Sequence, residues 1–337
     1  MVIGPIDKNL NELSIVCPTL YKEAWEKTYN EQTGYEKINV FKFRPRKKQS
    51  TTDINKRCKE CNDEEDDFFR IDEIENKKDI GNEKDLMKNM EKYYKNKGWH
   101  QYAKFNKKGG FSIPYILFKM KNIKDKDTRK EKWHKVRPKA PQIKHPMKKL
   151  YHMSGRAWSF ITKQLPGKHF ILNKTTEVPK LLDLANEKLG KYGDIEIQIT
   201  DIVGCFPNMP DRSIRKGMRY YIEELEKEHK YGVYVPSKET KQCAWKVKYN
   251  EKGYTFMSLK VLKDIMKFAL ENTIIKTANN QLHWQIEGIP MGDPHSPAMT
   301  LLACAYMEKK WMEKHMKDRK STRLNSSHTV ISYAVFC

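Results

Sequence analysis

An aspartate, Asp201, comes two residues after a short segment, residues 195–199 (IEIQI), whose alternation of apolar and polar residues is typical of a β-strand. A carboxylate at the end of a strand is well placed to hold a hard divalent cation such as Mg²⁺. Phe206 follows five residues later, where a bulky ring could check the sugar of a nucleotide. The same residues also fit an aspartate that caps a turn and a phenylalanine in the core.

A glycine- and proline-rich segment, residues 288–297 (GIPMGDPHSP), follows a predicted strand and precedes a long predicted helix. Because glycine adopts dihedrals that other residues avoid, such a loop can bring its backbone close to a flat or anionic ligand. The alternative interpretation is an ordinary loop in which a proline starts the helix.

Basic side chains gather on a predicted β-hairpin. Residues 111–121 and 133–140 are strand-like, and the segment between them is a charged turn. Lys135 and Arg137 on the second strand, with lysines on the first, suit a triphosphate or a backbone phosphate. A solvated edge strand protected by lysines would have a similar composition.

The cysteines give only weak evidence for a zinc site or for disulfide bonds. Cys58 and Cys61 form one C-x-x-C pair, a spacing that occurs in zinc sites, but no second pair follows. No nearby histidine completes the set, and Cys17 and His100 are the remaining candidates. Seven cysteines in no regular framework argue against a disulfide scaffold and favour a reducing compartment.

Helices and strands must position these residues. Helical periodicity predicts helices near 21–29, 148–164, 181–189, 212–229, 259–271 and 297–317. Residues 13–17 predict a strand, 273–277 and 282–287 predict a hairpin, and 231–257 predict a loop or hairpin insertion. Since strands and helices alternate irregularly, we expect an α+β fold.

The charge balance indicates the kind of partner. The 337 residues contain 65 Lys and Arg against 43 Asp and Glu, a net charge of +22. Such an excess predicts a polyanionic partner, most often a nucleic acid. A hydrophobic content of 38% excludes a wholly disordered chain. No apolar run is long enough to span a membrane and no secretory signal is visible, so we expect an intracellular protein without a membrane partner.

The last residues, 318–337 (DRKSTRLNSSHTVISYAVFC), differ in character from the chain before them. They are rich in serine and threonine, lack a helical period, and back-translate to what looks like a short-read sequencing adapter read in frame. We therefore expect a non-native tail and a natural sequence that departs from this one at about Lys317. A genuine polar tail is the alternative.

The order of hairpin, aspartate strand and glycine–proline loop resembles that of reverse transcriptases. Residues 136–150 (VRPKAPQIKHPMKKL) resemble the fingers motif around Arg-Pro, and residues 201–210 (DIVGCFPNMP) resemble palm motif A. Residues 283–311 resemble motif B, GxPxGxxxSP followed by a helix. Finer features resemble Penelope-like retroelements: the His-Trp-Gln before the loop, Met291 where many relatives carry Gln, the Asn-Met-Pro after motif A, and the opening GPIDKN…IVCPTLY.

The resemblance implies a right-hand polymerase fold with an antiparallel palm sheet, of which the fingers and part of the palm are present and the thumb is missing. Asp201 then matches the first catalytic carboxylate, which binds Mg²⁺ in a two-metal site. Phe206 matches the steric gate that blocks a 2′-hydroxyl and so favours DNA synthesis. Lys135 and Arg137 match the residues that grip the incoming triphosphate.

The same resemblance implies the remaining contacts. Met291 and Gly292 are expected to pack against the nascent base pair and so to bind the nucleotide. Template or primer binding is expected at Gly288, Pro290, Ser296 and Pro297. The partners are an RNA template, a DNA primer and dNTP. From composition alone, the basic and aromatic stretch Trp99–Lys108 is also expected to hold template, with its rings stacking on bases.

One part of the reverse-transcriptase pattern is absent from the sequence. Motif C, usually Y-x-D-D, should follow the motif B helix, but the pair Asp66-Asp67 lies far upstream and residues 332–335 belong to the tail. A single carboxylate cannot properly hold two divalent ions. We therefore expect this chain to be inactive, although an intact parent would copy RNA into DNA.

The expected domains are an N-terminal segment, a charged linker or insertion, the fingers, a partial palm and the tail, at 1–45, 46–90, 91–194, 195–317 and 318–337. The alternatives are a non-catalytic nucleic-acid-binding protein derived from a retroelement, a telomerase-like domesticated reverse transcriptase, and a viral RNA polymerase. Phe206 disfavours the last, because RNA-dependent RNA polymerases usually carry an aspartate at that position. Integration of such elements suggests a nuclear location.

Overall fold

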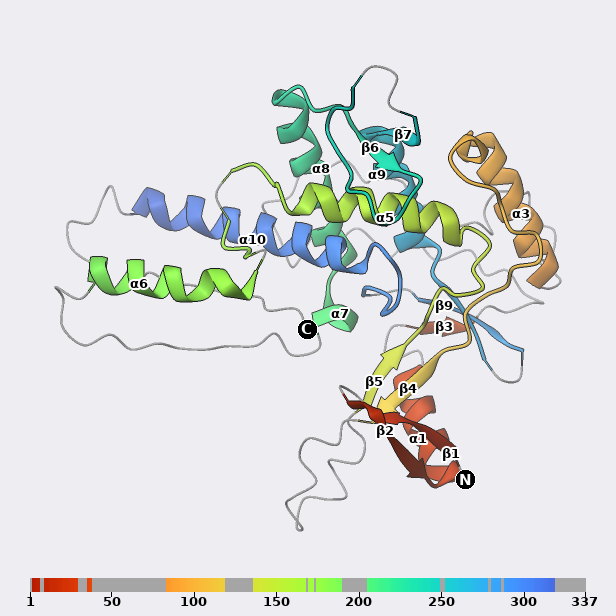
Figure 1. The fold of residues 1–337 in the computed structure, drawn as a ribbon. Helices are drawn as coiled ribbons and strands as arrows, with labels where there is room; N and C mark the ends of the chain where they lie inside the picture. The colour runs from red at the N-terminus through yellow and green to blue at the C-terminus, as the bar shows by residue number, and fades with distance from the viewer. Residues whose placement is uncertain are drawn as a thin grey trace, which may run out of the picture. The chain divides into compact units, whose positions relative to one another are not determined.

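The structure is a computed structural model of the chain (Figure 1). It describes residues 2–6, 9–29, 35–37, 83–118, 136–167, 169–172, 174–189, 205–248, 252–277, 280–285 and 288–318. Within these residues the chain is α+β, with small antiparallel sheets, which agrees with the expected fold class. Its contacts divide it into two units, Met1–Met153 with Ile265–Asp293 and Ser154–Asp264 with Pro294–Cys337.

Short antiparallel sheets organise the first unit. Strand β1 (Val2–Ile6) pairs with β2 (Asn9–Val16), which overlaps the predicted strand at 13–17 but begins earlier and ends one residue sooner. Strand β4 (Tyr115–Phe118) pairs with β5 (Val136–Lys139), so the predicted basic hairpin is confirmed with shorter strands. The charged turn between them and Lys135 lie outside the described residues.

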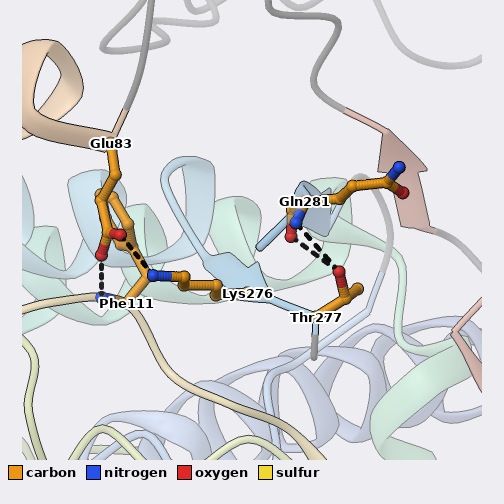
Figure 2. A network of polar contacts seen from close by, with 5 residues as sticks. All are labelled: Glu83, Phe111, Lys276, Thr277 and Gln281. Atoms are coloured by element: carbon orange, nitrogen blue, oxygen red, sulfur yellow. Dashed lines mark hydrogen bonds and ion pairs between the residues drawn. The ribbon is translucent and has the colours of Figure 1, made fainter. Parts of the chain in front are cut away.

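A further sheet of this unit, with three strands, has the order β3-β9-β8. Strands β8 (Ile274–Lys276) and β9 (Leu282–Gln285) form the predicted antiparallel hairpin, and β3 (Tyr35–Lys37) pairs with β9. The hydroxyl of Thr277 accepts a hydrogen bond from the backbone N–H of Gln281 at 3.1 Å and so closes the turn (Figure 2). This hairpin leads into the glycine–proline segment.

Helix α1 (Pro18–Thr28) packs on the β4–β5 hairpin. Pro18 suits the first helical position because the N–H that it lacks would have no intrahelical partner there. Tyr29 lies at the end of the helix and is 2% exposed. Its hydroxyl donates a hydrogen bond to the carbonyl of Tyr115 or of Lys139, and it accepts one from the Lys139 N–H at 3.1 Å. Its hydroxyl therefore bridges the two strands of the hairpin.

Helix α3 (Glu83–Asn96) begins inside the range expected to be a linker or insertion. Leu86, Met90 and Tyr94 recur at helical spacing and are buried. The short 3-10 helix η3 (Trp99–Gln101) follows, and its Trp99 packs edge-on against Phe268.

The expectation that the rings of the stretch 99–108 stack on template bases is wrong for its two largest apolar rings. Trp99 is only 1% exposed and Phe105 only 9%. Both pack against Tyr94, with ring centroids 6.0 and 5.3 Å away. These rings belong to the core, because burying each one removes a large apolar surface from water.

Glu83 ties three segments of the first unit together (Figure 2). Its carboxylate forms an ion pair with the Lys276 ammonium on β8, at 2.7 Å, and accepts a hydrogen bond from the Phe111 N–H at 3.3 Å. The next residue, Ser112, accepts a 2.7 Å hydrogen bond from the Lys276 N–H. These bonds align the segment before β4 with strand β8.

The second unit is mainly helical. It contains α6 (Val178–Leu189) after the short η5 (Thr175–Glu177), the short α7 (Cys205–Asn208), α8 (Asp211–Lys227) and α10 (Ser296–Asp318). Helices α8 and α10 pack closely at Gly217, where an added Cβ would lie 2.3 Å from the Leu302 carbonyl oxygen. The predicted helices at 181–189, 212–229 and 297–317 are confirmed with small shifts at their ends.

Helices α5 (Lys148–Thr162) and α9 (Leu259–Glu271) contribute residues to both units, and both were predicted. In the second unit, the indole N–H of Trp158 on α5 donates to the Leu262 carbonyl on α9 at 3.2 Å. Residues 231–257 contain β6 (Gly232–Pro236), which pairs antiparallel with β7 (Tyr254–Ser258). The predicted strand at 195–199 lies outside the part of the chain that the structure describes.

Candidate functional site

Strand β5 carries the basic residue of the candidate nucleotide site that the structure describes. Arg137 is half-buried and stands opposite Leu117 of β4 in the antiparallel register. Its strand is held from one side by the Tyr29 hydroxyl and by the core that Ala140 joins. The position of the arginine is therefore set by a packed hairpin and not by a free loop.

The loop 288–293 docks against the end of this strand. The N–H of Ala140 donates to the Met291 carbonyl oxygen at 2.8 Å. Gly292 has φ +121°, and a Cβ there would lie 3.0 Å from the Ala140 carbonyl oxygen. Glycine is thus required both by the dihedral and by the close approach. The sequence led us to expect a close approach to a ligand, whereas the described neighbour is the chain itself.

Members of the loop differ in their access to solvent. Gly292 is exposed and Met291 is half-buried, whereas Gly288 and Pro290 are buried. Gly288 also has a positive φ of 80°, which places a second left-handed residue at the start of the loop. The two residues predicted to contact the nascent base pair are therefore the ones that reach the surface.

A buried polar cluster includes the last residue of the loop. Asp293, His145 and Tyr151 are each at most 5% exposed. The His145 ring stacks on the Tyr151 ring at a centroid distance of 4.8 Å, and its Nδ1 accepts the Met147 N–H at 3.2 Å. This hydrogen bond places the ring proton of neutral histidine on Nε2.

Burial governs the titration of this cluster. Loss of solvation lowers the pKa of His145 to about 4, although the Asp293 charge acts in the opposite direction. Burial, with further contributions from Asp293 and Tyr93, also raises the pKa of Tyr151 well above its usual value. Neutral forms of both rings are therefore favoured at neutral pH.

We expect Gly292→Ala to loosen the loop from the strand. An alanine must adopt the positive φ and push against the Ala140 carbonyl, so we expect a loss of about 1–2 kcal/mol in the free energy of unfolding. Hydrogen exchange of the Ala140 amide should become faster, because that amide donates to Met291. Gly167 also has a positive φ, but no atom would lie within 4 Å of a Cβ added there. Gly167→Ala therefore controls for the dihedral alone. An unchanged exchange rate at Ala140 would contradict the prediction.

The other predicted site residues belong to the second unit. Phe206 is half-buried in the short helix α7. Ser296 is buried at the start of α10, where its carbonyl accepts the Thr300 hydroxyl at 3.0 Å, and Pro297 is exposed. Asp201 lies outside the described ranges.

The second unit contains a buried polar pair that the sequence analysis did not single out. Ser154 on α5 and His295, directly before α10, are both fully buried, and their side chains are hydrogen-bonded to each other. The His295 carbonyl accepts the Met299 N–H at 2.9 Å and so joins the first turn of the helix. His145 and Asp293 were missed in the same way, since nothing local marks a polar residue as buried.

No group of three or more His, Cys, Asp or Glu side chains in the described residues could hold a metal ion. The predicted zinc candidates Cys58 and Cys61 lie outside those residues, as does Asp201. In the same part of the chain, no helix is both long and apolar enough to cross a membrane.

Comparisons with known proteins place this geometry in context. No family model matches the sequence, and no curated protein matches it. Telomerase from Candida albicans, solved in complex with the TWJ fragment of telomeric RNA, is similar in structure with a TM-score of 0.42 and 11% identity. The match covers 69% of this chain and 40% of the telomerase chain. A TM-score this low does not establish a shared fold.

Proposed function

We propose that the chain is the fingers and part of the palm of a reverse transcriptase domain from a retroelement, most like the Penelope-like group. The observation that carries this proposal is the docking of loop 288–293 on the end of β5, through Ala140 and Met291. The two segments are far apart in the sequence, and they are the ones that resemble the fingers motif and motif B. The intact domain would synthesise DNA on an RNA template.

The docking suggests a division of roles. Arg137 would bind the triphosphate of the incoming dNTP, because a guanidinium suits the geometry of phosphate oxygens. Met291 and Gly292 would lie against the nascent base pair, where the absence of a side chain at Gly292 leaves the backbone accessible. Lys135 would add charge beside Arg137, and Phe206 would exclude a ribose 2′-hydroxyl.

Asp201 would be the residue that holds Mg²⁺. When bound, the metal would supply activation of the primer 3′-hydroxyl and charge stabilisation for the departing pyrophosphate. The sequence contains no second carboxylate pair after the motif B helix. The chain as it stands is therefore proposed to bind substrates without joining them.

Photo-cross-linking tests the nucleotide site without requiring catalysis. The full chain is mixed with an RNA template annealed to a DNA primer, Mg²⁺ and 8-azido-dATP, and the cross-linked peptides are mapped. We expect cross-links within 136–141 or 288–293, and about a tenfold loss of labelling in Arg137→Ala. Lys88→Ala removes one positive charge from an exposed side chain of α3 and should label like the wild type. Equal labelling of the two variants, or cross-links only elsewhere, would overturn the assignment.

A primer-extension assay tests the proposed inactivity. We expect no incorporation of dNTP by the purified chain, because one carboxylate position cannot hold two metal ions. Extension that depends on Mg²⁺ and stops with EDTA would refute the proposed inactivity. The charge of +22 favours a second candidate function, non-catalytic nucleic-acid binding. Template–primer binding without nucleotide labelling at 136–141 or 288–293 would support that second candidate.

A further inference from the structure

The β6–β7 hairpin and the connection between its strands are dense in lysines and aromatic rings. Residues 230–258 contain six lysines and six aromatic residues but only two glutamates and no aspartate. None of these residues belongs to the candidate nucleotide site. The combination of positive charge and rings is the composition that nucleic-acid-binding surfaces use.

The two faces of the hairpin differ. Val233, Val235 and Met257 are fully buried and form its inner face. Tyr234 and Phe256 stand opposite each other in the register and so share the outer face, with ring centroids 5.0 Å apart. The alternation of side chains along the strands thus places rings on the side that the core does not use.

Large rings of this hairpin are in contact with solvent. Phe256 on the outer face is 44% exposed, and Tyr231, which directly precedes β6, is 59% exposed. The Phe256 ring lies over Gly232, where a Cβ would come within 2.5 Å of its Cζ atom. Glycine at this position therefore lets the ring lie flat against the neighbouring strand.

Lysines lie over two other rings of the same segment. The Lys241 ammonium lies 5.5 Å from the centroid of the Tyr254 ring, and the Lys230 ammonium lies 5.0 Å from that of Trp245. Further exposed lysines follow along the connection at Lys238, Lys246, Lys248 and Lys252. Cations beside rings can bind the phosphates of a strand whose bases stack on those rings.

The connection is anchored on α5. Arg156 donates to the Pro236 carbonyl at 2.9 Å and to the carbonyls of Lys238 and Lys241 at 3.2 and 2.9 Å. The indole N–H of Trp245 donates to the Gln164 side chain at 3.0 Å. Three hydrogen bonds from one guanidinium fix the loop backbone. The loop would therefore lose less conformational freedom when a ligand binds to it.

We propose that Tyr231, Tyr234 and Phe256, with Lys238 and Lys241, form a platform that binds single-stranded nucleic acid. We call these five residues the hairpin platform. The rings need exposed base faces, which a duplex buries and a single strand offers. The lysines complement the phosphates in charge. The platform shares no residue with the proposed nucleotide site, and binding there does not depend on polymerase activity.

Fluorescence anisotropy of the full chain with a labelled twelve-nucleotide oligouridine tests the platform, with no primer or dNTP present. Phe256→Ala should weaken binding about tenfold, the order of effect expected for one stacked base. The slope of log affinity against log salt should not change, because no charge is removed. Lys238→Ala with Lys241→Ala should instead lower that slope by about 1.4, at about 0.7 per phosphate contact.

Two further variants keep the test decisive. Phe256→Leu retains apolar volume and should also weaken binding, which a purely structural role would not produce. Leu184→Ala on α6 removes an equally exposed apolar side chain and should bind like the wild type. Wild-type affinity in Phe256→Ala, or duplex binding as tight as single-strand binding, would overturn the proposal. If the chain bound phosphatidylserine vesicles but not RNA, and if Phe256→Ala abolished that binding, the partner of the hairpin platform would be a membrane surface instead.

Discussion

Between pH 7 and pH 4, the wild-type chain is expected to lose about 3 kcal/mol more unfolding free energy than His145→Asn. The folded pKa of His145 is about 4, and the unfolded value is about 6.5. Between these two pKa values, His145 takes up a proton in the unfolded chain but not in the folded chain. Stability therefore falls as the pH is lowered through it, and below pH 4 this residue adds no further loss.

Asparagine suits this comparison because its side-chain oxygen can still accept the Met147 N–H that His145 Nδ1 accepts. Urea unfolding at pH 4, 5, 6 and 7, followed by tryptophan fluorescence, measures the difference. Hydrogen exchange of the amides in 140–151 checks that the effect is local. His152→Asn makes the same substitution at an exposed histidine on α5 and serves as the matched control. Parallel curves for wild type and His145→Asn would contradict the prediction.

Gly217→Ala is expected to destabilise the second unit by about 2 kcal/mol, although alanine is the better helix former. The gain in helix propensity is about 1 kcal/mol, whereas overpacking costs about 3. The added Cβ would lie 2.3 Å from the Leu302 oxygen and 2.7 Å from its carbonyl carbon. These are backbone atoms and cannot rotate away, so α8 and α10 must move apart.

Thermal unfolding followed by circular dichroism measures this effect. A Tm several degrees below that of the wild type is the expected result. Glu226→Ala places the same residue on the exposed side of α8 and should leave the Tm within about one degree or raise it. A rise in Tm for Gly217→Ala would show that the two helices tolerate a methyl group at their crossing.

Elements with strong periodicity could be predicted from the sequence, and those without it could not. Helices α5, α8, α9 and α10 follow apolar spacing, and their predicted ranges agree with the structure. Helix α3 was not predicted, because the surrounding acidic and basic residues hid the spacing of Leu86, Met90 and Tyr94. Trp99 and Phe105 were misread because composition does not distinguish a ring in the core from one on the surface.

The candidate site could be predicted only in part for a similar reason. Met291 and Gly292 were found because glycine and proline mark an unusual loop. Their partner Ala140 could not be found, since contacts between distant segments leave no local pattern. The burial of His145 and Asp293 likewise depends on what packs around them, which neither residue type reveals.

The Tyr29 hydroxyl has a consequence for the order in which the chain is made. Its partners on Tyr115 and Lys139 lie 86 and 110 residues later in the sequence. At roughly 5–20 residues per second, a ribosome would complete β5 about 5–20 seconds after α1. For that time the apolar face of α1 has no hairpin to cover it. The nascent chain is therefore expected to need a chaperone during this interval.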